Sequence, residues 1–379
     1  MSGKFLFGEN VLGPVFYAFC AKLHLFQAGY EDHGVALYAT RGGARLKFLY
    51  ETFLKNQGLQ NIIPQELFYI SRFSSAVGCL SNDFEYVASL LQNQFWAKSN
   101  QEAIHLLLGE NVPHAIPNGE QPFTLENFKK IYYDSGEISS LLQKNCQEQY
   151  SCLFDYLNSL VKEQKKIVLV DTGWTGNTQA VLMRSFPQWE WNGAYFGKWD
   201  YRQISPWHFY SVTGLMVEKG LNDFIFQFHH IVEDPMEPNW DSVVQYYRKN
   251  GAIENNATTE KSADTVTEKD EQFSGIKSYF LKTKMMPFDE IEKRSSLALS
   301  ALKRGLLMPT KKDVDCILTR SRSADYGEDI STSVFSNKGS FIEKYKAALW
   351  KQGFLVHEYG RMGRIINTVY NLFDHSKLC

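Results

Sequence analysis

The chain has 379 residues, of which 44% are hydrophobic and 15% aromatic, and its 40 Lys and Arg residues nearly balance 42 Asp and Glu residues. This composition predicts a globular protein with one elaborated α/β domain or two domains, and it disfavours a disordered chain. A formal net charge of −2 gives no general attraction to a polyanion. Bulk nucleic-acid binding is therefore disfavoured, whereas a local basic site for a phosphate is still compatible with the charge.

The first 30 residues and the cysteines indicate in which cellular compartment the protein is expected. The apolar stretch 11–26 contains Lys22 and His24 and is interrupted by a Gly-Pro pair, so it falls short of the ~20 apolar residues that a membrane span needs. We predict instead a helix over 10–28 that covers one face of a sheet. The six cysteines are scattered, without a CxxC pair. We interpret them as reduced thiols of a cytoplasmic protein.

The next segment predicts the start of a parallel sheet. The apolar run 34–39 predicts a buried strand, which a glycine loop connects to a helix over 44–56. The run 67–70 predicts a second strand, which ends on Ser71-Arg72. Strand, helix and strand in this order are typical of a βαβ unit, in which loops gather at the carboxyl ends of the strands.

The middle of the chain predicts a helical insertion followed by more strands. Helical periodicity dominates the insertion, residues 80–163. The continuous apolar run 167–170 is typical of a central parallel strand that is buried on both faces. A helix over 179–186 and strands over 193–196 and 209–216 follow.

We therefore expect an α/β fold in which helices flank a parallel sheet, within a domain over 1–253 that includes the helical insertion. Residues 254–274 have the composition of a flexible loop or linker, and 275–379 form a helical C-terminal region. Helices are expected over 288–307 and 340–373, and the latter carries basic and aromatic side chains. Its amphipathic pattern indicates either packing on its own domain, which we favour, or contact with a membrane surface or lipid-linked glycan.

The strongest functional pattern is Asp-Thr-Gly-Trp-Thr-Gly-Asn-Thr at 171–178, directly after the buried strand. Backbone N–H groups of such a loop at a helix N-terminus form a phosphate cradle, to which Thr175 and Thr178 add hydroxyl donors. Asp171 is placed to accept hydrogen bonds from hydroxyls of the same ligand. The alternative is a structural βα turn in which Asp171 only bonds loop amides. The loop lacks the Lys of a Walker motif and the GxGxxG spacing.

A second loop, Arg41-Gly42-Gly43, follows the first strand. Its glycines permit backbone conformations that other residues avoid, and Arg41 offers a planar fork of donors to a phosphate. Such a loop can also be an ordinary turn. Because both loops follow parallel strands, we expect them to meet at one sheet edge and to bind a ligand with a phosphate at each end. Arg72 is expected at the same edge, where it contacts the ligand or forms a salt bridge at the end of the strand.

The two loops resemble those of type I phosphoribosyltransferases, whose donor is 5-phosphoribosyl 1-pyrophosphate (PRPP). In that family an Arg-Gly-Gly-type loop binds pyrophosphate, and a Thr-Gly-x-Thr loop binds the 5-phosphate. The resemblance implies a phosphoribosyltransferase-like sheet and Mg²⁺ held through the donor pyrophosphate. With Arg72, the donor-binding residues that we expect are Arg41, Gly42, Gly43, Asp171, Thr172, Gly173, Thr175, Gly176, Asn177 and Thr178.

Over most of its length the chain also resembles phosphoribosyltransferase-like proteins encoded with bacterial polysaccharide genes. The resemblance rests on Gly13-Pro14, Ser71-Arg72 and the run 171–174. It implies transfer of ribofuranose 5-phosphate from PRPP to a sugar hydroxyl of a glycan acceptor in the synthesis of a surface polysaccharide such as O-antigen or capsule. It also implies a separate phosphatase of the haloacid-dehalogenase type that acts on the product, and at most peripheral contact with the inner membrane.

Two positions depart from the family pattern. The first of the family's two motif acids is Val170 here, so only Asp171 is left to contact the ribose hydroxyls. Trp174 replaces an acid that assists the base in purine-salvage members. An indole cannot transfer a proton but can stack on a sugar ring, so we assign Trp174 to acceptor binding. Two alternatives stay open: a nucleobase phosphoribosyltransferase, against which Trp174 argues, and a non-catalytic binding or scaffold protein of the same fold, which Val170 suggests.

Glycosyl transfer would need further acidic groups. A carboxylate near the ribose, Asp171, would stabilise positive charge at C1, and a base would help a weakly nucleophilic sugar hydroxyl. Glu233 and Asp200 are the catalytic candidates besides Asp171, although each could instead cap a helix or face solvent. His229 and His230 are interpreted as structural, because no partner lies at the spacing of a metal site.

Overall fold

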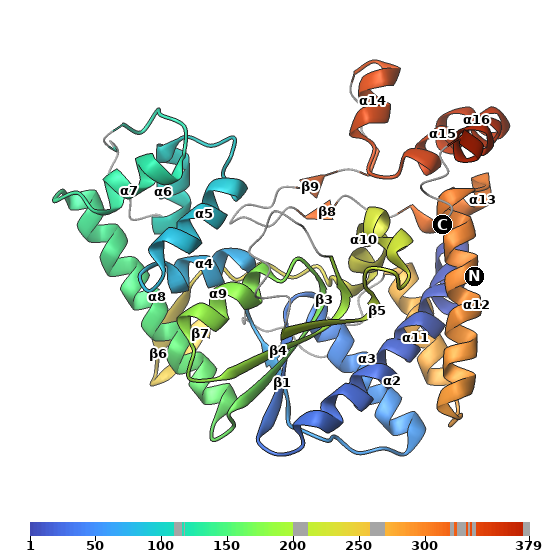
Figure 1. The fold of residues 1–379 in the computed structure, drawn as a ribbon, viewed down its shortest axis with the longest axis horizontal. Coiled ribbons are helices and arrows are strands. Elements are labelled where there is room, and N and C mark those ends of the chain that lie inside the picture. Colours follow the sequence, from blue (N-terminus) through green and yellow to red (C-terminus); the bar gives the residue numbers. More distant parts are fainter. Residues whose placement is uncertain are drawn as a thin grey trace.

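A five-stranded parallel sheet forms the centre of the molecule, with the strand order β2-β1-β3-β4-β5 (Figure 1). The computed structural model describes residues 1–109, 116, 118–199, 211–257, 270–318, 322–323, 331–332, 334–335 and 339–373. The strands are β1 (Gly34–Ala39), β2 (Gln65–Phe68), β3 (Lys166–Trp174), β4 (Glu190–Lys198) and β5 (Val212–Val217). The expected α/β class, with helices flanking a parallel sheet and a helical C-terminal region, is confirmed.

Helices precede, separate and follow these strands. Those of the N-terminal half are α1 (Gly3–Phe7), α2 (Gly13–Gln27), α3 (Gly42–Gln57), α4 (Arg72–Leu80), α5 (Phe84–Gln94), α6 (Asn100–Leu108), α7 (Leu125–Tyr132), α8 (Glu137–Val161) and α9 (Asn177–Ser185). The C-terminal half has η4 (Asp223–Phe228), α10 (His229–Glu233), η5 (Asp234–Met236), α11 (Glu271–Lys282), α12 (Phe288–Leu307), α13 (Lys311–Ile317), α14 (Phe341–Ala347), α15 (Lys351–Tyr359) and α16 (Arg361–Phe373). Two short hairpins are also present, β6 (Tyr246–Lys249) with β7 (Ala252–Asn255), and β8 (Arg322–Ser323) with β9 (Ser331–Thr332).

The sheet separates two hydrophobic clusters, because successive side chains of a strand point to opposite faces. On β3, Val168 and Val170 belong to the cluster that includes α2, α3, α11 and α12. Ile167 and Leu169 belong to the cluster that includes α4, α5, α8 and α9. Figure 1 shows these two groups of helices on opposite sides of the sheet. The C-terminal helices α11 and α12 thus share a hydrophobic cluster with one face of the sheet.

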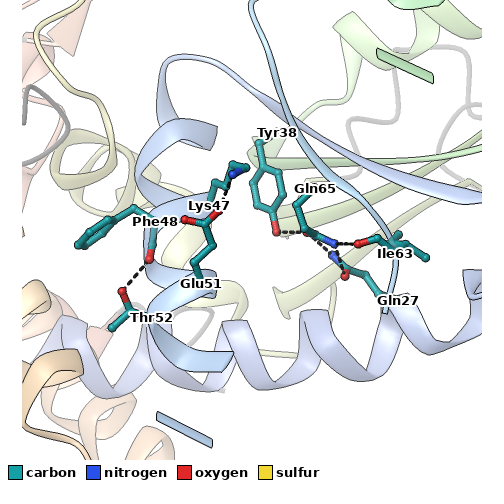
Figure 2. A network of polar contacts seen from close by, with 8 residues as sticks. All are labelled: Gln27, Tyr38, Lys47, Phe48, Glu51, Thr52, Ile63 and Gln65. Carbon is teal, nitrogen blue, oxygen red and sulfur yellow. Dashed lines mark hydrogen bonds and ion pairs between the residues drawn. The ribbon is translucent and has the colours of Figure 1, made fainter. Parts of the chain in front are cut away.

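A polar network is buried where α2 meets β1 and β2 (Figure 2). Tyr38 is fully buried, and its hydroxyl donates a 2.7 Å hydrogen bond to the side-chain oxygen of Gln65. The amides of Gln65 and Gln27 exchange hydrogen bonds of 3.0 and 3.2 Å, and the Gln65 amide also donates to the carbonyl of Ile63. Because a buried hydroxyl without a partner is costly, this network holds the edge strand β2 in register with β1.

The N-terminal helical run is longer than the sequence predicts, since α1 begins at Gly3 and a π-helical turn joins it to α2. By length and composition, Gly3–Tyr30 is the one helical run among the described residues that could cross a membrane. Within its most apolar window, 67% is buried inside the fold. A core helix of a soluble protein passes the same test of length and composition, so this run is weak evidence for a span.

Two predicted boundaries are wrong near the sheet edge. The second strand ends at Phe68, because Ser71 caps α4 by accepting a hydrogen bond from the Ser74 amide at 2.9 Å. Arg72 is therefore the first residue of α4 and not the end of a strand. Strand β3 continues beyond the apolar run to Trp174, since its glycine-containing end pairs with β4.

Candidate functional site

A cavity of about 320 Å³ lies at the carboxyl ends of β1 and β3. The sequence-predicted residues that line it are Arg41, Gly42, Arg72, Asp171, Thr172, Gly173, Trp174, Thr175, Gly176, Asn177, Thr178 and Glu233. Gly43 lies outside the lining, because it packs on β1: a Cβ at this position would lie 2.6 Å from the main-chain carbonyl carbon of Tyr38. Asp200 lies outside the described residues. The two predicted loops thus meet at one site.

The first loop presents a helix N-terminus and a cation to the cavity. Arg41 occupies the N-cap position of α3 and gives no side-chain cap. Its guanidinium is mostly buried and lies 3.4 Å from the Glu237 carboxylate and 3.4 Å from the Trp240 carbonyl oxygen. These long contacts hold Arg41 at the cavity wall. An anion in the cavity can compete with Glu237 for the same donors.

The second loop presents another helix N-terminus. Gly176 is the N-cap residue of α9 in the left-handed conformation, with φ of 69° and no side chain to bond the first amides. Gly173 has φ of 117°, and a Cβ there would lie 2.0 Å from the Gly197 carbonyl oxygen. Gly173 therefore requires glycine, and the left-handed conformation of Gly176 favours it. The first-turn amides of α9 are consequently available to an anion.

The N-termini of α3, α4 and α9 converge on this cavity, since Gly42, Arg72 and Asn177 at their starts all line it. Each helix contributes partial positive charge at its N-terminus. The loops themselves are close, because a Cβ on Gly42 would lie 3.5 Å from the Thr172 side chain. The convergence gives the cavity an electropositive wall, although none of the described residues that line it is a lysine.

Acidic side chains line the same cavity, namely Asp171, Glu233 and Glu237. Burial raises the pKa of Asp171 to about 7, and Glu233 and Glu237 also raise it, against a 2.7 Å hydrogen bond from the Thr172 amide and the charge of Arg72. The Asp171 carboxyl can therefore exchange a proton near neutral pH. That property suits both hydrogen bonding to hydroxyls and proton transfer.

The acids around Asp171 come from a segment that a buried arginine holds in place. Glu233 ends α10, and Glu237 follows the short helix η5. Arg45 donates a 2.7 Å hydrogen bond to the carbonyl of Pro235 within this segment and pairs with Asp270 at 3.2 Å. The Arg45 side chain is almost completely buried. It therefore fixes the acidic segment against α3, beside the cavity.

Aromatic side chains form another part of the wall. Trp174 lies edge-on to His229, with ring centroids 5.8 Å apart, and Trp199 stacks on Phe226 at 5.6 Å. The Trp174 ring lies so close to β4 that a Cβ on Gly197 would come within 1.9 Å of it. The Trp174 indole nitrogen is buried and has no hydrogen-bond partner among the described residues. This part of the wall therefore contains one unsatisfied buried donor.

Several cavity residues were not singled out from the sequence as ligand-binding: Glu237, Tyr195, Trp199 and His229. Glu237 could have been found only as another acid close to Glu233 in the sequence, because α10 ends at Glu233 and the backbone of Glu237 is extended. Tyr195 of β4 is the register partner of Asp171 on β3, so their side chains point to the same face of the sheet. His230, by contrast, is buried as expected for a structural histidine.

No group of three or more His, Cys, Asp or Glu side chains that could hold a metal ion occurs in the part of the chain that the structure describes. Neither a scan against protein-family models nor a search of curated proteins found a match for this chain. The chemistry of the cavity must therefore carry the assignment of a function.

Proposed function

We propose that this chain is a PRPP-dependent phosphoribosyltransferase that moves ribofuranose 5-phosphate to a sugar hydroxyl of a glycan acceptor. One observation carries the proposal: the helices α3 and α9, neither of which has a side-chain cap at its N-terminus, begin at one cavity, each shortly after a strand of the same sheet. Helix N-termini bind phosphate groups. A donor with a phosphate at each end and hydroxyls between them matches this pair of N-termini.

Different residues of the cavity bind different groups of the donor. Arg41 and the start of α3 bind the pyrophosphate, with Glu237 giving up its 3.4 Å contact to Arg41. The start of α9 binds the 5-phosphate, assisted by the hydroxyls of Thr175 and Thr178. Asp171 accepts hydrogen bonds from the ribose hydroxyls and, when ionised, stabilises positive charge at the ribose C1.

Magnesium fits this site as a partner of the substrate. Because the described residues offer no three-ligand metal cluster, Mg²⁺ would be held chiefly by oxygens of the donor pyrophosphate. When bound there, it neutralises the charge of the leaving group. Arg41 and the N-terminus of α3 bind the remaining pyrophosphate oxygens.

The aromatic wall and Glu233 bind and activate the acceptor in this proposal. An aromatic side chain packs well against the C–H groups of a sugar ring, and Trp174 and Trp199 both line the cavity. Glu233 lines the cavity with Asp171 and serves as the general base for the attacking hydroxyl. Such an enzyme would act in the cytoplasm during surface polysaccharide synthesis, and a separate phosphatase would remove the 5-phosphate from the product.

The test is calorimetric titration of the purified chain with PRPP, with and without Mg²⁺. Ribose 5-phosphate and a nucleoside triphosphate are the ligand controls. We expect Mg²⁺-dependent, selective binding that Arg41→Ala weakens by about tenfold or more, as for loss of a charged hydrogen-bonded contact. Arg248→Ala, which removes an exposed arginine paired with Asp155 outside the cavity, should bind normally. Absence of binding, or equal binding of the triphosphate, would overturn the proposal.

Pyrophosphate release then tests catalysis and the acceptor class. Turnover with an oligosaccharide and not with a purine or pyrimidine base would support the glycan acceptor. Selective PRPP binding without turnover on either class would indicate a non-catalytic binding protein instead. Loss of turnover with retained PRPP affinity in Glu233→Gln would support the role of Glu233 as the base.

A further inference from the structure

Helix α16 (Arg361–Phe373) exposes the apolar side of an amphipathic helix. Its apolar residues recur at spacings of three and four, which places them on one face: Met362, Ile365, Ile366 and Val369. These side chains are between 45% and 66% exposed. The surface helix of a globular protein ordinarily buries such a face. Helix α16 therefore turns its apolar face toward solvent and not toward the interior of the protein.

The contact between α16 and α15 explains this orientation. A Cβ on Gly363 would lie 1.9 Å from the Leu355 carbonyl oxygen, so the two backbones touch there. Asn367 is almost completely buried and donates a 2.8 Å hydrogen bond to the Gln352 carbonyl. Turning the helix to bury its isoleucines would lose both contacts. The sequence of α16 thus directs its apolar face outward.

A groove of about 620 Å³ adjoins α16 and combines apolar and cationic side chains. Its apolar lining includes Leu6, Phe7 and Met308. Its cations are Arg304, Lys312 and Arg364, none of which forms an ion pair with another described residue. The one acid in the lining, Asp313, already accepts hydrogen bonds from the amide and hydroxyl of Thr310 as the cap of α13. The groove therefore has net positive charge beside exposed apolar surface.

We propose that α16 and this groove dock on an anionic phospholipid surface. The apolar face of α16 inserts among acyl chains, while the groove cations and Arg361 contact lipid phosphates. Residues 339–373 contain five Lys or Arg and two Asp or Glu, although the whole chain has a formal charge of −2. The positive charge is thus concentrated where apolar residues are exposed. Helix α14 adds Phe341 and Ile342, both exposed, to this region.

The charge also argues against a second copy of the chain as the occupant. A symmetric dimer through α16 would bring Arg361 and Arg364 of both copies together, and like charges in one interface are unfavourable. An anionic bilayer complements the same charges. In the view of Figure 1, α14, α15 and α16 lie on the same side of the sheet as α10. Docking through α16 is independent of which ligand the sheet-edge cavity binds.

Vesicle flotation with the full chain tests the inference. Neutral phosphatidylcholine vesicles are compared with vesicles in which about a third of the lipid is phosphatidylglycerol. We expect about tenfold stronger binding to the anionic vesicles, and its loss at high salt. Ile365→Glu should reduce binding by about tenfold, whereas Leu281→Glu, at an equally exposed leucine of α11, should not. Arg364→Gln should weaken binding to anionic vesicles only.

Several results would overturn the inference. One is equal binding of the wild-type chain to neutral and anionic vesicles, or binding to neither. Another is unchanged binding of Ile365→Glu. A third is a dimer in light scattering that Ile365→Glu converts to monomer, which would make a second copy the occupant of this face. Normal PRPP titration of Ile365→Glu is expected and separates a failure here from a failure of the proposed enzyme activity.

Discussion

Replacing Asp171 with asparagine should stabilise the folded chain at neutral pH. Burial raises the pKa of this carboxyl from 3.8 to about 7. A pKa change of one corresponds to about 1.4 kcal/mol, so the whole increase sets an upper limit of about 4 kcal/mol on the destabilisation. Because the carboxyl also opens onto the cavity, solvent reduces this value, and we expect about 2 kcal/mol.

The sign follows from where the proton is held. A raised pKa means that the folded state keeps a proton which the unfolded state has lost, between about pH 4 and pH 7. The free energy of unfolding of the wild-type chain therefore falls across this window and stays lower above it. The asparagine variant lacks this titration. Its melting temperature should match the wild type near the low end and exceed it by about 2–3 °C above pH 7, for a chain of this length.

The assay is thermal unfolding of both proteins over this pH range, followed by circular dichroism. Asp32→Asn at an exposed position is the control and should leave the melting temperature unchanged at every pH. A difference between Asp171→Asn and wild type that does not vary with pH would refute the reasoning.

The same variant should lose PRPP binding, because an amide is a poorer acceptor of ribose hydroxyls than a carboxylate. Gain of stability with loss of binding is typical of a functional residue.

Two further predictions concern packing beside the cavity. Gly43→Ala should lower the free energy of unfolding by about 2 kcal/mol, because its Cβ would collide with the main chain of Tyr38, whereas Gly42→Ala, which makes only ordinary contacts, should change it by less than about 0.5 kcal/mol. Equal effects in urea unfolding would contradict this. Arg45→Met should cost about 3 kcal/mol, because it leaves the Asp270 carboxylate in a largely buried position without its cation. A loss below about 1 kcal/mol would show that this pair is as weak as an exposed one.

The sheet could be predicted where apolar runs are bounded by clear turn residues. The run 34–39 coincides with β1, and the run 288–307 with α12. The apolar run predicts the second strand two residues too late, because Tyr69 and Ile70 are apolar whereas the first half of β2, Gln65 and Glu66, is polar. What ends β2 is the capping of α4 by Ser71, which competes with strand extension and which hydrophobicity does not reveal.

The candidate site could be predicted as two loops but not as a complete cavity. Parallel topology was sufficient to bring Arg41 and Thr175 to one edge. Glu237 comes from a segment whose position depends on tertiary contacts, such as the hydrogen bond from Arg45 to the carbonyl of Pro235. No local pattern encodes that contact. The same holds for α16, whose amphipathic pattern was visible but whose outward orientation depends on Gly363.

Val170 stands where the phosphoribosyltransferase family has the first of its two motif acids, and its position in the fold explains why an acid is not expected there. Its side chain is fully buried in the cluster on the α2 side of the sheet, opposite the face to which Asp171 points. A carboxylate at 170 in this fold would be desolvated in that cluster, and Val170→Asp should unfold the chain before it could add a ligand contact. The carboxylates that accompany Asp171 instead come from Glu233 and Glu237. Because Glu233→Gln, at the general base, should keep its PRPP affinity, Glu237→Gln is the variant whose PRPP affinity shows whether a cavity acid replaces the lost one.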